Sequence, residues 1–97
     1  MVYEVRFQTT DPERRAEYVR MYKQAIQEIK TAGCKGGLIL CSEDDPASVL
    51  VPLEWNSKEH HLRWRGTPPH RRFRAAVEGS GLQTKRSTGG YYCAETI

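Results

Sequence analysis

The chain has 97 residues, of which 38% are hydrophobic and 28% charged, and it carries a formal net charge of +3. This composition, without any apolar run near the roughly 18 residues that cross a bilayer, predicts a globular protein and excludes a membrane span. Lysine and arginine are interspersed with acidic residues everywhere except over 58–74, so charge alone does not predict a nucleic-acid binder.

The length predicts one domain over residues 1–97. A domain of this size buries only about two-thirds of the surface of its unfolded chain, so association with a second copy would add stability. The first residues, MVYEVRF, lack the continuous apolar stretch of a signal peptide, which favours a cytoplasmic location. Cys34, Cys41 and Cys93 are odd in number and form no CxxC pair, so we expect reduced, mostly packed thiols.

The first elements are a strand and a long helix. Residues 2–10 alternate with period two, which predicts a strand whose two faces meet different surroundings. Asp11 followed by Pro12 and Glu13 is typical of a helix start, because the carboxylate accepts an unpaired N–H and proline suits the first turn. Gly33 can close that helix in the left-handed conformation, so the pattern predicts a helix over 12–32.

A hairpin follows. Residues 34–43 read as a strand weakened by two glycines, the DDPAS segment at 44–48 supplies turn chemistry, and β character resumes through Trp55. Pro52 cannot donate a hydrogen bond, so its strand is expected to have an edge-facing site or a bulge there.

The last third predicts a broken helix and a final strand. Ser57 caps a helix that GTPP at 66–69 interrupts before it continues to about residue 78. The segment 78–90 is expected to be a loop too polar to pack, and 90–97 the last strand.

The order β-α-β-β-α-β predicts an α+β, ferredoxin-like domain, in which both helices cover one face of a four-stranded antiparallel sheet. Neither alternating set of the first strand is wholly polar, so the opposite face also carries large residues. A symmetric partner covering that face is the simplest expectation.

Three stretches carry a family resemblance: GCKG at 33–36, EDDP at 43–46, and LEWNSKEHHLRWRGTPPHRRFRAAV at 53–77. With the long first helix, they resemble the antibiotic biosynthesis monooxygenase domain. The resemblance implies a homodimeric α+β barrel with a pocket between sheet and helices. Members include oxygenases that convert quinols or anthrone-type polyketides to quinones without metal or flavin, haem-degrading oxygenases, and proteins with no established activity.

Trp64 is the first site candidate, since haem-degrading relatives place a tryptophan at the matching position. His61, three residues earlier, shares its helical face. Haem is disfavoured because those relatives carry a proximal histidine where this chain has Arg74, and their first-strand asparagine is missing. Trp55 more often seals a sheet-to-helix corner than takes part in chemistry.

Cofactor-free oxygenation requires a deprotonated, electron-rich substrate that gives an electron to O₂ in a water-poor pocket. Neutral imidazole can take a phenolic proton, so we expect His61, or secondly His70, as the base. A solvated histidine is an equally good interpretation of each. Arg6 and Arg74 are the candidate cations for the oxyanion.

Three further residues are candidates for binding the substrate. Phe73 is expected on the inner side of the broken helix, Asn56 could donate a hydrogen bond although it more often starts a helix, and Tyr3 could orient a hydroxyl although strand aromatics usually pack. No metal site is predicted, because adjacent histidines on a helix point about 100° apart and no acid is placed to complete a site.

Together with these residues, the resemblance implies a cofactor-free monooxygenase that uses molecular oxygen on an aromatic polyketide or quinol in secondary metabolism. Two alternatives stay open: a redox-neutral cyclase, isomerase or lyase in the same cavity, and a non-catalytic ligand-binding dimer. Six cations over 58–74 with interleaved aromatics superficially resemble a platform for single-stranded nucleic acid. A solvated face or a rim that steers anionic substrates is the more common role of such a stretch.

Overall fold

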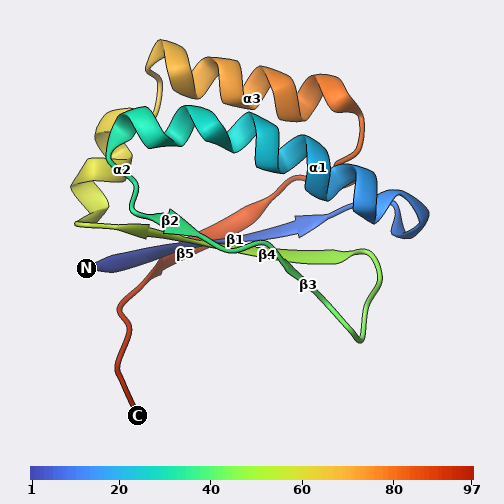
Figure 1. Cartoon of the computed structure of the whole chain (residues 1–97), viewed down its shortest axis with the longest axis horizontal. Helices are drawn as coiled ribbons and strands as arrows, with labels where there is room; N and C mark the ends of the chain where they lie inside the picture. Colours follow the sequence, from blue (N-terminus) through green and yellow to red (C-terminus); the bar gives the residue numbers. More distant parts are fainter.

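The sheet is built on two eight-residue strands that pair antiparallel along their whole length. In the computed structural model, which describes residues 1–97, these are β1 (Val2–Thr9) and β4 (Ser48–Trp55). β5 (Thr88–Tyr92) pairs with the other edge of β1, while β2 (Gly36–Gly37) and β3 (Leu40–Cys41) both pair with β4. The order is β2-β4-β1-β5 (Figure 1), which confirms the antiparallel ferredoxin-like arrangement.

The sheet has five strands rather than four, because the strand predicted over 34–43 is interrupted. Its two halves are β2 and β3, with Leu38 and Ile39 between them. The Leu38 N–H donates to the Pro52 carbonyl across 3.1 Å. Since the N–H and C=O of a strand residue point the same way, the nitrogen of Pro52 faces this gap. The expected edge-facing site at Pro52 is confirmed.

The helix predicted over 12–32 forms as three successive segments. A 3₁₀ turn η1 (Pro12–Arg14) leads into α1 (Arg15–Ala25), and a second 3₁₀ segment η2 (Ile26–Ala32) follows it. The Asp11 carboxylate accepts from the Glu13 N–H at 3.0 Å, as predicted for the cap. Gly33 ends the helix with φ of 84°, the left-handed region that glycine adopts without strain.

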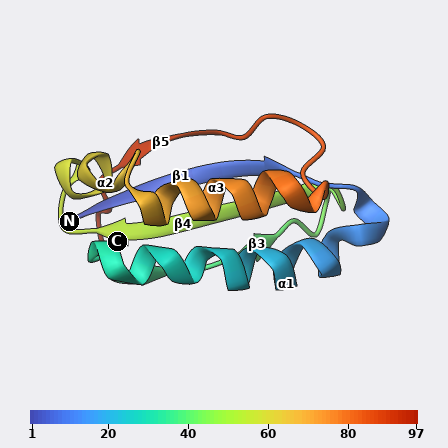
Figure 2. The same ribbon diagram turned by 90° about the horizontal axis from the view of Figure 1, so that it is seen from above.

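The broken helix is also confirmed. Ser57 caps α2 (Lys58–Trp64) by accepting from the His60 N–H, and Thr67 caps α3 (Pro68–Ser80) in the same way. Gly66 between them has φ of 79°. Seen from above, α1 and α3 lie side by side over the same face of the sheet (Figure 2).

The C-terminal part departs from expectation. α3 continues to Ser80, β5 begins at Thr88, and residues 93–97 form no strand. The segment thought too polar to pack contains Leu82, which is buried in the core. Its carbonyl accepts from the Thr10 hydroxyl at 2.7 Å, so this segment is fixed to the end of β1.

The cysteines correct another expectation. Cys41 and Cys93 are exposed rather than packed, because one lies on the short edge strand β3 and the other just beyond β5. Cys34 is partly buried, and its thiol lies 3.3 Å from the Glu54 carbonyl. All three are free.

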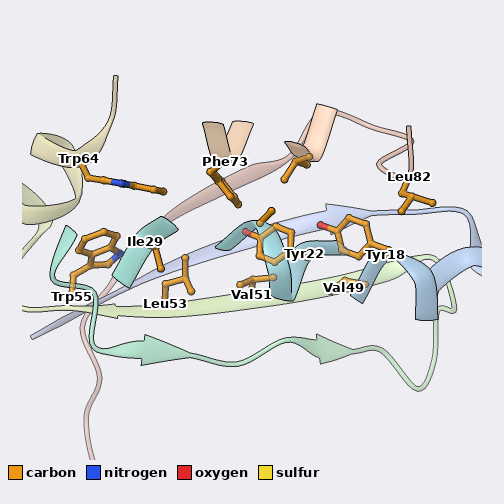
Figure 3. Close-up of a cluster of buried hydrophobic side chains, with 12 residues drawn as sticks. Tyr18, Tyr22, Ile29, Val49, Val51, Leu53, Trp55, Trp64, Phe73 and Leu82 are labelled. Carbon is orange, nitrogen blue, oxygen red and sulfur yellow. The ribbon is translucent and has the colours of Figure 1, made fainter. Parts of the chain in front are cut away.

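The core lies between the helices and the sheet. β4 points Val49, Val51, Leu53 and Trp55 into it, with Val49 below Tyr18 and Val51 below Tyr22 of α1 (Figure 3). Burying a side chain of this size stabilises the fold by about 1.5–3 kcal/mol, so this row is a major part of the stability. None of the helices combines the length and apolarity that crossing a membrane requires.

The opposite face of the sheet is not covered by a helix (Figure 1). Strand alternation places Tyr3, Val5 and Phe7 of β1 on it, together with Leu50 of β4 and Tyr92 of β5. Phe7 is 47% exposed and Tyr92 52%. Large exposed residues gathered on one face are typical of an interaction surface.

Candidate active site

Polar residues of β1 face the helices. The alternation that turns Tyr3 and Phe7 outward turns Glu4, Arg6 and Gln8 toward the covered face, where Glu4 and Gln8 are buried. Charged residues are almost never buried without partners, so Glu4 in particular requires an explanation. Its register neighbours are Leu53 on β4 and Tyr91 on β5.

Glu4 is held by three side chains. Its Oε1 accepts a hydrogen bond from the Trp55 indole N–H at 3.2 Å and lies 3.3 Å from His61 Nε2. Its Oε2 lies 3.9 Å from the Arg6 guanidinium. Desolvation raises the pKa of Glu4 above its usual value, while Arg6, the Trp55 hydrogen bond and Arg65 oppose the rise.

His61 links Glu4 to Tyr91. Its Nδ1 lies 2.5 Å from the Tyr91 hydroxyl, and its Nε2 faces Glu4. Because Glu4 Oε1 already accepts from Trp55, we assign the proton to Nε2, so that Nδ1 accepts from the Tyr91 O–H. Burial, followed by Arg65 and Arg6, lowers the pKa of His61 to about 4, so the imidazole is neutral at neutral pH.

Tyr91 is oriented from both sides. Besides its bond to His61, its ring lies under the Lys58 ammonium, 4.8 Å from the ring centroid. Desolvation, and then the nearby Glu4 charge, raise the pKa of Tyr91, so the hydroxyl keeps its proton at neutral pH. A hydrogen bond joins His61 to Tyr91 and a close Nε2–Oε1 contact joins His61 to Glu4, so these three side chains are linked across three elements, β1, α2 and β5.

Aromatic rings surround the linked side chains of Glu4, His61 and Tyr91. Trp55 lies 5.1 Å from His61 between ring centroids, and Trp64 lies 4.9 Å from His70 and 5.8 Å from Phe73. Trp64 is 6% exposed, and its indole N–H has no partner in the protein, so it is available to an acceptor on a bound molecule. His70 Nδ1 accepts from the Gly66 N–H at 3.1 Å, and burial with Arg74 lowers its pKa.

A cavity of about 360 Å³ opens beside these residues, between the β1–β5 side of the sheet and the helices. Its lining combines the wall of Trp64, Phe73 and Val77 with the Tyr91 and His61 side chains. Its volume lies in the range of small-molecule sites. Gly89 contributes no side chain, and a Cβ there would lie 2.6 Å from the Val5 carbonyl oxygen.

The structure brings together six of the eight residues expected from the sequence. The cavity is lined by His61, Trp64, His70, Arg74, Arg6 and Phe73. Asn56 is exposed at the end of β4, and Tyr3 lies on the uncovered face of the sheet, so neither reaches the cavity.

Sequence reasoning missed Glu4, Arg65 and Arg86, and it judged Tyr91, a strand aromatic that could orient a substrate hydroxyl, more suited to packing; all four line the cavity. One signal was present: Glu4, Arg6 and Gln8 occupy alternate positions of the first strand, and one of its two faces must be covered by helices. Tyr91 could not be distinguished from Tyr92 without knowing which face of the last strand points inward.

His60 takes no part in this site. Its Nδ1 lies 2.7 Å from the Ser57 hydroxyl at the start of α2. No group of three or more His, Cys, Asp or Glu side chains is arranged to hold a metal ion.

The fold and the cavity define a small ferredoxin-like α+β protein with an aromatic, arginine-lined pocket between sheet and helices. The model of one family, antibiotic biosynthesis monooxygenase, matches residues 1–76. The chain belongs to the antibiotic biosynthesis monooxygenase family. No curated protein matches the sequence.

Solved structures with the same fold cover nearly the whole chain. A Bordetella bronchiseptica protein whose description carries the same family name superposes with a TM-score of 0.86 at 18% identity, covering 98% of this chain and 97% of its own. A variant of SnoaB, a cofactor-independent oxygenase from Streptomyces nogalater, gives 0.77 at 19% identity, with 99% and 94% covered. Rv0793 from Mycobacterium tuberculosis gives 0.73 at 18% identity, with 99% and 96% covered.

Proposed function

We propose that this protein is a cofactor-independent monooxygenase that oxidises an aromatic polyketide or quinol-type substrate in secondary metabolism. The observation that carries the proposal is the chain from Glu4 through His61 to Tyr91, which ends at an aromatic-walled cavity. Family membership and the fold shared with the oxygenase SnoaB support it.

Substrate deprotonation is the first step. Tyr91 Oη accepts the acidic proton of the substrate as its own proton moves to His61 Nδ1, and the Nε2 proton of His61 moves to Glu4. The pKa directions favour this outcome, because burial that lowers the pKa of His61 and raises that of Glu4 makes the carboxylate the better proton store. His61 therefore acts through Tyr91, and neither of its nitrogens needs to touch the substrate.

Oxidation follows from the anion. With an anthrone, the deprotonated substrate gives one electron to O₂, the radical pair combines through a C–O bond into a peroxide, and cleavage of the O–O bond with loss of water leaves the quinone. For an anthrone the sum is anthrone plus O₂ to anthraquinone plus water, which balances without another reductant. The Trp64 N–H and the Arg6 guanidinium line the cavity where negative charge develops, and charge stabilisation of this kind is commonly the largest catalytic contribution.

Oxygen uptake with a panel of anthrones and naphthohydroquinones, in the presence of a chelator, tests the proposal. We expect Tyr91→Phe to lower kcat/KM by about 10²-fold or more, the lower range for loss of a general acid–base group. Tyr92→Phe is the matched control, because the adjacent tyrosine lies on the other face of β5. Oxygen uptake equal to background over the whole panel would contradict the proposal, and so would equal activity in the two variants. Substrate turnover under nitrogen would instead identify a redox-neutral enzyme.

The working form proposed is a cytoplasmic homodimer. The uncovered sheet face with exposed Phe7 and Tyr92 supports pairing with a second copy, since an antiparallel sheet needs a cover for such residues. The cavity lies on the other, helix-covered face, so each subunit would keep a complete set of Glu4, His61 and Tyr91.

A further inference from the structure

Cationic side chains are concentrated around the cavity. Four arginines line it, from β1, the end of α2, α3 and the segment before β5: Arg6, Arg65, Arg74 and Arg86. Glu4 is the one acidic residue in the lining, although the whole chain has 15 basic and 12 acidic residues. The positive charge of the cavity is therefore much larger than composition predicts.

The arginines differ in how their charge is compensated. Arg6 donates to the Ser87 hydroxyl at 2.6 Å and lies near Glu4, and Arg74 pairs with Glu78 at 2.9 Å. Arg65 and Arg86 form no ion pair with any side chain of the protein. Guanidinium groups that face one cavity without acidic partners repel each other, and a bound anion relieves that repulsion.

Two of the four arginines, Arg74 and Arg86, lie at one end of the cavity. Arg74 and Arg86, together with Val77 and Gln83, also line an adjoining hollow, to which Lys85 and one acidic residue, Glu78, contribute. Arg65 lies at the other end, where its backbone N–H donates to the His61 carbonyl at 3.2 Å. The cavity thus has a proton-transfer end and a separate cationic end.

We propose that Arg74 and Arg86 form a binding subsite for a carboxylate on the aromatic substrate, so that the preferred substrate is an aromatic acid rather than a neutral polyketide or quinol. This rests on the proposed function for the chemistry at the Tyr91 end, but not for the binding. A single oxyanion at Tyr91 has Arg65 and Arg6 beside it and leaves Arg86 without an anionic partner, whereas Arg74, which lines the same hollow as Arg86, is paired with Glu78. Planar guanidinium groups match carboxylates in shape and donate two parallel hydrogen bonds.

The test compares two ligands that differ only in charge: a hydroxynaphthoate, with hydroxyl and carboxylate at opposite ends of the rings, and the corresponding hydroxynaphthamide. Isothermal titration calorimetry under nitrogen measures both dissociation constants. We expect the acid to bind about tenfold tighter or more, the effect of one charge-assisted hydrogen bond. Arg86→Gln and Arg74→Gln should each reduce that preference, and the double variant should abolish it.

Arg20→Gln is the matched control, since this exposed arginine of α1 lines neither hollow and its replacement changes the net charge equally. Its acid-to-amide ratio should equal that of the native protein. The subsite is refuted if acid and amide bind equally, if the double variant keeps the preference, or if Arg20→Gln lowers it as much as Arg86→Gln. Because no oxidation is measured, these outcomes are independent of whether the protein is an oxygenase.

Discussion

Burial shifts the proton affinities of Glu4 and His61 in opposite directions. Both side chains are below a tenth exposed, and desolvation is the first cause of each shift, because it disfavours a charged carboxylate and a charged imidazolium alike. These shifts favour a neutral imidazole beside a carboxylate whose affinity for a proton is raised. This arrangement suits a set of side chains that must accept a proton from the substrate and return it.

The pKa of His61 gives a stability prediction with a definite sign. The unfolded chain takes up a proton near pH 6.5 and the folded one only near pH 4, so the stabilisation present above pH 6.5 is lost as the pH falls through that window. Between pH 7 and 5, denaturant unfolding should show the native protein losing about 1–2 kcal/mol more than His61→Gln. Glu4 is present in both proteins, and parallel stability curves would show that His61 is not shielded from protonation.

At the scale of elements, the edge strand β2 comes so close to the β4 backbone that a side chain does not fit between them. A Cβ on Gly37 would lie 2.3 Å from the Pro52 carbonyl oxygen and 2.8 Å from the Leu53 side chain, so β2 can approach β4 only with glycine there. We expect Gly37→Ala to lower the free energy of unfolding by about 1–3 kcal/mol, the usual cost of overpacking.

Gly79→Ala is its counterpart within α3, where a Cβ would meet nothing within 4 Å. It should raise the free energy of unfolding by about 0.5 kcal/mol, because alanine loses less conformational freedom than glycine in a helix. Urea titration of both variants measures the two effects. If Gly37→Ala were as stable as Gly79→Ala, the close β2–β4 approach would be wrong.

At the scale of the whole molecule, the uncovered sheet face is the proposed dimer interface. Phe7→Glu places a charge among Tyr3, Val5 and Leu50, and should convert the proposed dimer to a monomer in size-exclusion chromatography with light scattering. Leu62→Glu on α2 is the control, because Leu62 is 43% exposed against 47% for Phe7 but lies on a helix. A native protein that is already monomeric, or a Phe7→Glu variant that stays dimeric, would refute an interface on this face.

Local chemistry determined most of the elements from the sequence alone. The Asp11 and Ser57 caps, the glycine at 33 and the break at 66–69 act through neighbours within a few residues, so they are readable without tertiary information. The polar segment after α3 was misjudged because Leu82 is buried by contacts with β1, far away in the sequence.

The tertiary structure alone decided which side chains share the site. The family resemblance indicated Trp64, and helical spacing added His61. Glu4 and Tyr91 are 57 and 30 residues from His61 and meet it only because β1 and β5 are neighbours in the sheet. Which tyrosine of the last strand faces inward depends on register, and a shift of one residue would exchange Tyr91 with Tyr92. Long-range strand pairing therefore fixed the contacts of His61 with Glu4 and Tyr91, which no local pattern could predict.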